Sequence, residues 1–399
     1  MVIFKPNQND IIGVHRPAES RGRLARLAEL WPIFSLVVAY TATVQLPGLS
    51  GAGTSPELRE LTAAADAEIL YYGRARCLPG GVPSNPTGAP GPSIITRAAF
   101  NLLPAMPYVC IDAGLKVAAD VPGLVKLDGA MPSEAVNTGH ALPLEVVTRL
   151  FAAGLEVGQG LAQCFDAKNY LIIAESVPGG TTTALGLLMG LGVDAEQRVS
   201  SSMPDNAHNS KLAAVLAGLA AAGATKGTFS SEPLAAVAAV GDPMQAAVAG
   251  IAIAASKYMP VVLGGGTQMA AVLALMAALR VVPPPAFAKL ISQAQPTNLA
   301  LATTRWVWAD PTADLMGLAV AIESRFGTLA VPYLAANLDF STSRYAPLRL
   351  YEQGYVKEGV GAGAAAMAAI INGPYHAQAL LPSIERVYED LVLAPNQTL

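Results

Sequence analysis

The segment from Tyr170 to Val193, YLIIAESVPGGTTTALGLLMGLGV, carries residue types that suit a phosphate site at a turn. Its apolar, β-branched beginning is typical of a buried strand, and its leucine-rich end is typical of a helix. Glycines let a ligand approach the backbone, and N–H groups and hydroxyls at a helix start donate to phosphate oxygens. A tight turn with a threonine cap is the alternative without a ligand. The candidate residues are Gly179, Gly180, Thr181 and Thr182, beside the carboxylate of Glu175.

Two other segments offer groups for the same kind of ligand. SSSMPDNAHNSKLAAVL places Ser201 in a serine turn before a helix and Lys211 just inside that helix, which suits a phosphate monoester, although a solvated lysine is commoner. MPVVLGGG places Gly264 and Gly265 where a strand ends. Because α/β sheets bind ligands beyond the carboxyl ends of their strands, these turns together predict a site for a phosphorylated small molecule.

Glu358 is the candidate general base. In YVKEGVGAGAAAMA it is a lone carboxylate that leads a helix of small residues. A neighbouring apolar wall would raise its pKa and make it a usable base near neutral pH. A glutamate that only stabilises the positive end of a helix dipole is the alternative.

The elements that must position these residues alternate between strand and helix. Buried strands are expected at 34–42, 108–114, 170–175 and 259–266, and helices at 142–165, 210–223 and 242–258. Such alternation implies crossover connections, so we expect an α/β fold with a doubly wound, mostly parallel sheet flanked by helices, similar to a Rossmann fold. The Pro- and Gly-rich segment 77–93 and the stretch that follows Val281 are expected to be binding loops or lids, not linkers between domains.

Composition excludes several classes of protein. The chain has 399 residues, 52% of them hydrophobic and 14% charged, with a net charge of -4, so it has no polybasic surface for nucleic acid. Three scattered cysteines and four scattered histidines show no metal-ligand spacing and fit a reducing compartment, the cytoplasm. The mean hydropathy is +0.41, but glycine or proline interrupts each long apolar run, so no membrane span is expected. The start of the chain has no signal-peptide pattern.

The order and spacing of the motifs resemble the nicotinate mononucleotide:dimethylbenzimidazole phosphoribosyltransferase family of cobamide synthesis. ESVPGGTTT at 175–183 is similar to the family's Glu-x-Gly-x-x-Asn-Thr-Thr turn, and SSSMPDNAHNSK at 200–211 to its Gly-Thr-Gly segment with acids and a lysine. LGGG at 263–266 resembles the Leu-Asp-Gly strand end. TTRWVWADPTADL at 303–315 resembles a Ser-containing, acidic-Pro segment, and KEGVGAGAA at 357–365 resembles the closing Gly-Glu-Gly-x-Gly-Ala element, which holds the family's catalytic glutamate.

Several positions depart from the family pattern. Ser176 and Val177 follow Glu175 where the family has a glycine, and Thr181 stands near the family's asparagine. Serines replace the glycines of Gly-Thr-Gly, Gly264 stands at an aspartate position, and the Pro-Pro-Gly-Ser-Leu-Gly entry of the bacterial enzymes is missing. These departures indicate a divergent branch, of archaeal or cyanobacterial type.

The resemblance implies that phosphoribose is transferred from nicotinate mononucleotide to a benzimidazole nitrogen, with nicotinate leaving and an α-linked ribazole phosphate as product. It implies Glu358 as the base and Glu175 as a group that stabilises positive charge on the ribose or binds its hydroxyls. No cofactor or metal is required, because the leaving pyridinium is already cationic. The implied phosphate and substrate contacts are Gly179, Gly180, Thr181, Thr182, Ser201, Lys211, Gly264, Gly265, Thr304 and Arg305, and a looser alignment places Ser93 and Arg97 at the base pocket.

The resemblance also implies a homodimer and one phosphoribosyltransferase-like unit over 1–399. Its α/β core is expected over about 31–375, with residues 1–30 and 376–399 forming a small helical subdomain, as in relatives.

Three alternatives stay open at this point. A dinucleotide-dependent dehydrogenase would use VGAGAAA, but no acid ends a strand about twenty residues further on. A nucleotide-binding relative without turnover would keep the fold alone. A transferase could also use a purine or a phenol as the acceptor.

Overall fold

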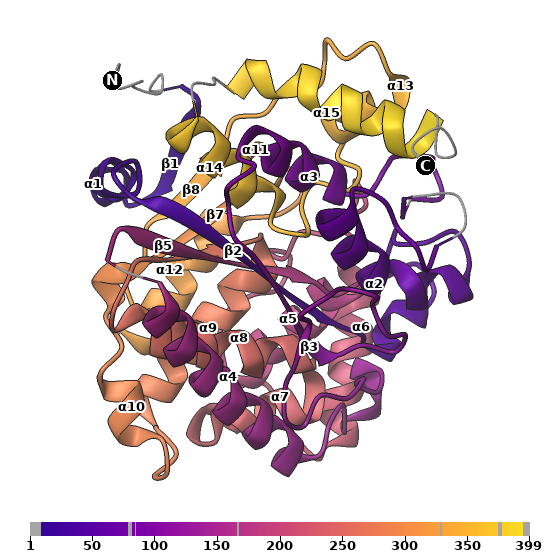
Figure 1. Cartoon of the computed structure of the whole chain (residues 1–399). Coiled ribbons are helices and arrows are strands. Elements are labelled where there is room, and N and C mark those ends of the chain that lie inside the picture. Colours follow the sequence, from indigo (N-terminus) through magenta and orange to yellow (C-terminus); the bar gives the residue numbers. More distant parts are fainter. Residues whose placement is uncertain are drawn as a thin grey trace.

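The computed structural model describes residues 9–78, 82–83, 85–165, 167–327, 329–373 and 377–393. Within these residues, eight strands form a single sheet (Figure 1). The strands are β1 (Ile11–His15), β2 (Trp31–Ala39), β3 (Tyr108–Gly114), β4 (Val125–Lys126), β5 (Asn169–Ser176), β6 (Val261–Gly264), β7 (Leu299–Thr304) and β8 (Tyr333–Ala336).

The sheet is doubly wound, as the alternation of strand and helix predicts. Its strand order is β1-β8-β7-β6-β5-β2-β3-β4, and all neighbours are parallel except β1 and β8. Strands β2 to β4 are added toward one edge and β5 to β8 toward the other. The direction therefore reverses between β2 and β5, which is the switch point where such sheets bind ligands.

Helices cover both faces of the sheet (Figure 1). On one face, α4, α5, α7, α8 and α9 contribute to a core with Ile33, Val37, Leu171 and Ile173 of the central strands. On the other face, α2, α3, α14 and α15 pack over Phe34, Leu36 and Ile172. The central strands are buried on both faces, so their sequences are almost continuously apolar. The helix bounds are α1 (Pro17–Leu27), α2 (Pro56–Tyr72), α3 (Ser93–Leu102), α4 (Leu144–Cys164), α5 (Gly180–Gly190), α6 (His208–Ala221), α7 (Pro233–Val240), α8 (Pro243–Ser256), α9 (Thr267–Val281), α10 (Ala288–Ser292), α11 (Arg305–Trp308), α12 (Leu315–Phe326), α13 (Ala346–Arg349), α14 (Ala362–Asn372) and α15 (Leu380–Tyr388).

Small residues let the helices of one layer pack backbone against backbone. A Cβ atom on Gly154 of α4 would lie 2.4 Å from the carbonyl oxygen of Ala247 in α8, and one on Gly158 would lie 2.3 Å from that of Ile251. This close packing explains why the sequence is rich in glycine and alanine. In the part of the chain that the structure describes, no helix combines the length and the apolar composition needed to cross a bilayer.

The four expected strands are present, with ends that shift by a few residues. The strand expected at 259–266 is shorter in the structure, because β6 ends at Gly264 and the next glycines form the turn into α9. The sequence did not predict β1, β4, β7 or β8. Strands β7 (LALATT) and β8 (YLAA) are rich in alanine and leucine, which indicate helix as readily as strand.

The segments near the chain ends lie on the main sheet and its helical layer. The described N-terminal residues add β1 to the edge strand β8 in antiparallel register, from Ile11 opposite Ala336 to His15 opposite Tyr333. Helix α15 packs against α3 (Figure 1) and buries Leu380, Ile384 and Val387. The division into an α/β core over about 31–375 and a small helical subdomain from residues 1–30 and 376–399 stays a prediction. Residues 1–8, 376 and 394–399 lie outside the described residues.

Candidate active site

A cavity opens at the switch point of the sheet, beyond the carboxyl ends of β2 and β5. Its empty volume is about 920 Å³, part of which is open to solvent at the mouth. The turn after β5, the loop before α14, the start of α9 and the segments 49–53 and 200–202 form its walls. This position is typical of a small-molecule site in an α/β protein.

Glu175, near the end of β5, faces this cavity from a buried position. Its side chain is only 2% exposed. Oε2 accepts a hydrogen bond from the N–H of Val177 at 3.1 Å, and Oε1 accepts one from Nε2 of Gln268 at 3.1 Å. Burial, together with the neighbouring carboxylate of Glu358, raises the pKa of Glu175 to about 8.

Glu358 lies in the loop between α13 and α14 and lines the same cavity. Its Oε2 accepts from Oγ1 of Thr303 at 2.9 Å and from the N–H of Thr304 at 2.7 Å. Its Oε1 accepts from the N–H groups of Gly359 at 3.3 Å and Gly363 at 3.1 Å. Burial raises the pKa of Glu358 to about 7, although these four hydrogen bonds favour the charged form. Glu358 thus stabilises the start of α14, as the alternative interpretation held, and also presents a carboxylate to the cavity.

The backbone of the Glu358 loop is left-handed at three non-glycine residues, which brings the two glutamates into one site. The φ angles are 65° at Val356, 62° at Lys357 and 54° at Val360. The N–H of Val360 donates to the carbonyl oxygen of Glu175 at 2.8 Å, so the loop is tied to the end of β5. Such backbone conformations cost of order 1–3 kcal/mol each and are concentrated at functional sites.

The turn after β5 requires glycine because it approaches the segment after β2. Gly179 has φ 84°, and a Cβ atom there would lie 2.8 Å from the backbone nitrogen of Val44. The turn leads directly into α5, and Gly180 and Thr181 at the start of this helix line the cavity. The N–H of Gly180 donates to the carbonyl oxygen of Val177 at 2.9 Å and that of Thr182 to Gly179 at 3.0 Å, so the N–H of Thr181 is the one that a ligand could accept from. A helix start of this kind favours a negatively charged ligand.

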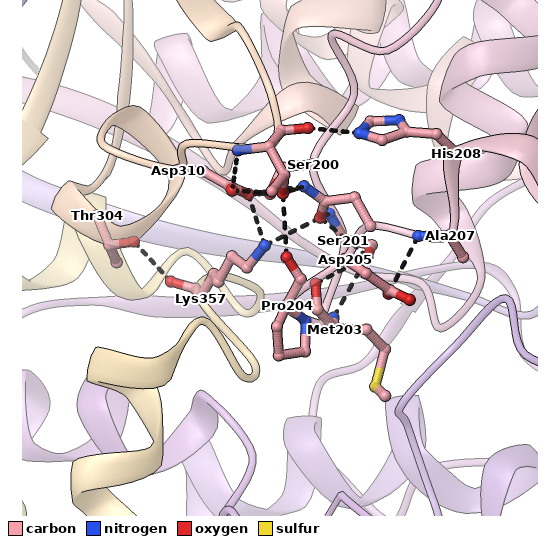
Figure 2. A network of polar contacts seen from close by, with 12 residues as sticks. Ser200, Ser201, Met203, Pro204, Asp205, Ala207, His208, Thr304, Asp310 and Lys357 are labelled. Carbon is pink, nitrogen blue, oxygen red and sulfur yellow. Dashed lines mark hydrogen bonds and ion pairs between the residues drawn. The ribbon is translucent and has the colours of Figure 1, made fainter.

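The serine turn 200–202 lines another part of the cavity and is supported by a buried polar network (Figure 2). Lys357 Nζ lies 2.5 Å from Oδ2 of Asp310 and 2.9 Å from Oδ1 of Asn206. Asp310 also accepts from Oγ of Ser200 at 3.1 Å. Lys211 is fully buried behind this turn and donates to the carbonyl oxygen of Ser200 at 3.0 Å.

This network contains groups of both charges. The amines of Lys211 and Lys357 and the carboxyl group of Asp310 are buried, and the carboxylate of Asp205 acts on both lysines from nearby. Burial, together with the charge of Lys357, lowers the pKa of Lys211 to about 7, against the charges of Asp310 and Asp205. An anion bound at the serine turn would favour the charged form of both lysines. The cavity is therefore polarised, with buried cations near the serine turn and the two glutamates beside β5.

The structure brings six of the residues predicted for the site to the cavity wall. These are Glu175, Gly179, Gly180, Thr181, Ser201 and Glu358. Two further residues support them from behind. Thr304 holds Glu358 through its N–H and donates from Oγ1 to the carbonyl oxygen of Lys357 at 2.6 Å, and Lys211 holds the serine turn.

The other predicted residues do not line the cavity. Thr182 and Ser93 are fully buried, and Gly264 packs under α14, where a Cβ atom would lie 2.8 Å from that of Ala364. Gly265 packs beside Glu175, since a Cβ atom there would lie 3.7 Å from its Oε1. Arg305 forms ion pairs with Glu352 and Asp339, and Arg97 donates to the carbonyl oxygen of Leu70 at 2.8 Å. The catalytic and binding roles of all these residues remain predictions.

The sequence analysis missed four residues that shape the site. Thr303 and Gln268 hold the two glutamates, Lys357 supports the serine turn, and Asp66 of α2 lines the cavity. Asp66 carried a signal, because LTAAADAEIL places an acid on the buried face of a helix. Gln268 follows the predicted glycine turn directly, but no pattern indicates that it reaches Glu175.

We expect Gly180→Ala to impair the site by displacing Gln268. A Cβ atom at Gly180 would lie 1.9 Å from Oε1 of Gln268, which is the end of a flexible side chain, and the φ of Gly180 is not positive. The alanine should therefore be accommodated while the hydrogen bond from Gln268 to Glu175 is lost. Loss of one hydrogen bond of about 1–1.5 kcal/mol corresponds to about a tenfold lower kcat/KM. Steady-state kinetics of Gly180→Ala and Gln268→Ala would measure this, and the two variants should agree.

The control is Gly160→Ala in α4, where a Cβ atom meets nothing within 4 Å. That variant should keep full activity. A fully active Gly180→Ala beside an impaired Gln268→Ala would contradict the steric argument.

Comparisons with known proteins agree with this fold. The family model described as phosphoribosyltransferase matches residues 98–303. The UPF0284 protein of Gloeobacter violaceus is 44% identical over 90% of this chain and 88% of its own length, and that of Gloeothece citriformis is 42% identical over 90% and 94%. The crystal structure of CobT from Thermus thermophilus superimposes with a TM-score of 0.54 over 92% of this chain and 95% of that chain, at 19% identity. A second structure from the same organism, titled as the nicotinate-nucleotide–dimethylbenzimidazole phosphoribosyltransferase, gives 0.52 over 94% and 92%, at 19% identity.

The family match and the doubly wound fold with its switch-point cavity define a phosphoribosyltransferase, an enzyme that transfers a pentosyl group. The chain belongs to the nicotinate mononucleotide:dimethylbenzimidazole phosphoribosyltransferase family, as the order of its motifs predicts. Its similarity to the UPF0284 proteins of cyanobacteria agrees with the divergent branch that its altered glycines indicate.

Proposed function

We propose that this protein transfers phosphoribose from nicotinate mononucleotide to a ring nitrogen of a benzimidazole-type base, and releases nicotinate and an α-ribazole phosphate. The observation that carries the proposal is that Glu175 and Glu358, two carboxyl groups with raised pKa, face one cavity. The serine turn 200–202, which buried lysines support, lines another part of the same cavity. A nucleotide with an anionic phosphate and a cationic pyridinium ring matches this polarity.

The reaction requires two things of the protein, which are a general base and the correct alignment of the two substrates. The acceptor nitrogen without hydrogen attacks the glycosidic carbon, and the bond from that carbon to the pyridinium nitrogen breaks. Its electron pair neutralises the leaving ring. The proton on the acceptor's other nitrogen passes to Glu358, so the product is neutral at the azole and nicotinate leaves as a stable molecule. A positioned base of this kind contributes about 10²–10⁴-fold, and alignment of the two substrates contributes more.

Glu358 suits the role of base because its pKa of about 7 leaves it partly ionised at neutral pH. Glu175 has the higher pKa, about 8, because burial and Glu358 disfavour its charge. A protonated Glu175 can donate a hydrogen bond to a ribose hydroxyl, and an ionised one can stabilise the positive charge that develops on the sugar. The phosphate contacts proposed are the N–H groups of Gly179 and Thr181 and the hydroxyls of Thr181 and Ser201, with Lys211 behind the serine turn. Gly180 is proposed only as a point of close backbone approach, because its N–H already donates to the carbonyl oxygen of Val177 at 2.9 Å.

Mass spectrometry of the products tests the proposal. Nicotinate mononucleotide is mixed with a panel of bases that includes 5,6-dimethylbenzimidazole, benzimidazole, adenine and p-cresol. We expect one equivalent of nicotinate for each equivalent of phosphoribosylated base. A protein that binds nicotinate mononucleotide in calorimetry but forms no product with any base would be the nucleotide-binding relative without turnover.

The homodimer implied by the family resemblance stays part of this proposal. Sedimentation equilibrium of the full chain would test it.

A further inference from the structure

The loop that carries the proposed base is bonded directly to the serine turn. The N–H of Val356 donates to the carbonyl oxygen of Ser202 at 2.9 Å. The ammonium group of Lys357 reaches the same turn through Asn206, whose Oδ1 lies 2.9 Å from Nζ. That oxygen also accepts from the N–H of Ser201 at 2.6 Å and from its Oγ at 3.1 Å. One amide oxygen therefore holds both the turn and the loop.

Lys357 also contacts the residue that holds Glu358. The carbonyl oxygen of Lys357 accepts from Oγ1 of Thr304 at 2.6 Å, and the N–H of Thr304 donates to Oε2 of Glu358 at 2.7 Å. Lys357 thus bonds to the support of the serine turn with its side chain and to the support of Glu358 with its backbone. Because Glu358 follows Lys357 directly in the chain, a shift at either contact displaces the carboxyl group.

The ammonium group of Lys357 is placed to act through the serine turn. Its Nζ lies 2.5 Å from Oδ2 of Asp310, and the same Oδ2 accepts from Oγ of Ser200 at 3.1 Å (Figure 2). The side chain of Lys357 is 2% exposed. Because this ammonium group is already bonded and covered, we expect it to influence a ligand by fixing the turn rather than by direct contact.

The backbone conformation of the loop makes these contacts necessary. Val356, Lys357 and Val360 have left-handed φ angles between 54° and 65°. Non-glycine residues keep such a conformation only where the surrounding contacts enforce it, so the loop should relax when those contacts weaken. The position of Glu358 therefore depends on bonds that are made at the serine turn.

The phosphate of the proposed donor is the group that would bind at this turn. It takes no part in bond making or breaking, because it is attached to the ribose at C5′ and the reaction takes place at C1′. A phosphate that accepts from the turn would fix it, and with it the loop that carries the base. Enzymes use the binding energy of such remote groups to align the reacting ones, so substrates that lack them lose kcat as well as affinity.

We infer that Lys357 is a positioning residue that couples the phosphate of the donor to Glu358, so that a bound phosphate raises kcat by fixing the base. This inference rests on the proposed function and gives the phosphate a role beyond affinity. The alternative is that the ion pair of Lys357 and Asp310 only stabilises the fold.

Two donors test the coupling. Nicotinate mononucleotide and nicotinate riboside share the glycosidic bond and the leaving group, and the riboside lacks only the phosphate. With the acceptor that gives the most product, kcat is measured at saturating donor. In the wild type, kcat with the riboside should be about 10–100-fold lower, the size expected for a small misplacement of a reacting group. Inorganic phosphite added with the riboside should restore part of this kcat.

Lys357→Met should remove the effect of the phosphate. Its kcat with nicotinate mononucleotide should fall by about 10–100-fold, toward the value with the riboside, while its kcat with the riboside should change little. Phosphite should no longer raise kcat with the riboside. A residue that only stabilises the fold would lower both kcat values in proportion, so the ratio of the two distinguishes the coupling from the alternative.

The double variant of Lys357→Met and Asp310→Leu separates the coupling from stability. It has no charge left at this buried pair, and apolar replacements of a buried ion pair often preserve stability. It should therefore unfold at a higher urea concentration than Lys357→Met does, while the ratio of its two kcat values stays as low as in that single variant. It also carries the test if the single variant does not fold.

Glu68→Gln is the matched control for the loss of a buried contact. Glu68 is 1% exposed and accepts from the N–H of Cys77 at 2.8 Å and from that of Asp120 at 3.0 Å. It does not line the cavity. This variant should lower the free energy of unfolding and leave the ratio of the two kcat values as in the wild type.

Hydrogen exchange measures the same coupling without turnover. Nicotinate mononucleotide should slow the exchange of the backbone amides at 356–360 in the wild type, and the riboside at equal saturation should slow it less. This difference between the two donors should be absent in the double variant.

Two results would overturn the inference. One is an equal kcat with both donors in the wild type, and the other is a ratio that the folded Lys357 variants leave unchanged. If the wild type forms no product with any acceptor, the proposed function fails instead. Hydrogen exchange then decides alone, since a response at 356–360 that depends on the phosphate supports the coupling, and an equal or absent response to both donors refutes it.

Discussion

Replacing Glu358 by glutamine is expected to lower kcat by about 10²–10⁴-fold and to leave the affinity for nicotinate mononucleotide nearly unchanged. The amide has almost the same shape, but it cannot take the proton of the acceptor azole. Each oxygen of Glu358 accepts two hydrogen bonds, and the NH₂ group of glutamine cannot accept the pair that it would face. We therefore expect the free energy of unfolding to fall by about 1–3 kcal/mol. Steady-state kinetics, calorimetry with the nucleotide and urea unfolding separate the three effects.

The pH dependence of kcat/KM tests the role of Glu358 independently. Because Glu358 must be ionised to accept a proton and its pKa is raised to about 7, kcat/KM of the wild type should rise with pH through about 7. The titration of Glu175, with its pKa near 8, is coupled to this one, so the profile reports the pair. In Glu358→Gln the rise near pH 7 should disappear.

Glu385→Gln is the control for Glu358→Gln. Oε1 of Glu385 accepts from Oγ of Ser343 at 2.8 Å and from the N–H of Arg344 at 2.9 Å, the same pair of donor types that Glu358 accepts from Thr303 and Thr304. It lies outside the cavity lining, so this variant should retain its activity at every pH. An active Glu358→Gln enzyme would exclude Glu358 as the base.

Lys357→Met is expected to destabilise the protein by about 3–5 kcal/mol, because it leaves the buried carboxylate of Asp310 without its cation. The methionine retains most of the apolar stem, and the side chain of Lys357 is 2% exposed, as is that of Asp310. Burial by itself would raise the pKa of Asp310, but Asn206 and Lys357 hold it below its ordinary value. Urea unfolding at neutral pH, where Asp310 is ionised in both states, measures the full effect.

Lys226→Met is the control for charge removal alone. Lys226 Nζ lies 3.3 Å from Oε1 of Glu196 and 3.6 Å from Oδ1 of Asp194, but its side chain is 39% exposed. Exposed ion pairs contribute about 0–1 kcal/mol, so this variant should unfold almost as the wild type does. Equal small losses in both lysine variants would mean that the network of Figure 2 does not stabilise the fold.

A second variant tests whether the Asp310 charge is the cause. Lys357→Met combined with Asp310→Leu removes both charges, and the double variant should recover part of the stability lost by Lys357→Met. The loop carries Glu358 next to Lys357, so kcat should fall in the single variant as well.

Local sequence patterns determined much of this protein. The apolar runs that become β2, β3, β5 and β6 are buried on both faces, so composition alone marks them as central strands. The turn ESVPGGTTT and the element KEGVGAGAA were predicted to be parts of one site, because glycine turns with hydroxyls suit a phosphate and a lone carboxylate suits a base. The order of these motifs along the chain also indicated the family, since order and spacing hold information that single motifs lack.

Tertiary structure alone decided how these parts form one site. Glu175 and Glu358 are 183 positions apart in sequence, and they meet because β5, β6 and β7 lie side by side and the left-handed loop at 356–360 connects the end of β7 to the end of β5. Asp66 also reaches this cavity only through the fold, because its sequence signal is an acid on the buried face of a helix and does not show which residues it meets. Arg305 was predicted to contact the substrate, but its side chain forms an ion pair with Glu352. Its neighbour Thr304 donates to Glu358 instead. Local propensity fixes where strands and turns begin, but the direction of a side chain and its pKa depend on residues that the chain brings near only after folding.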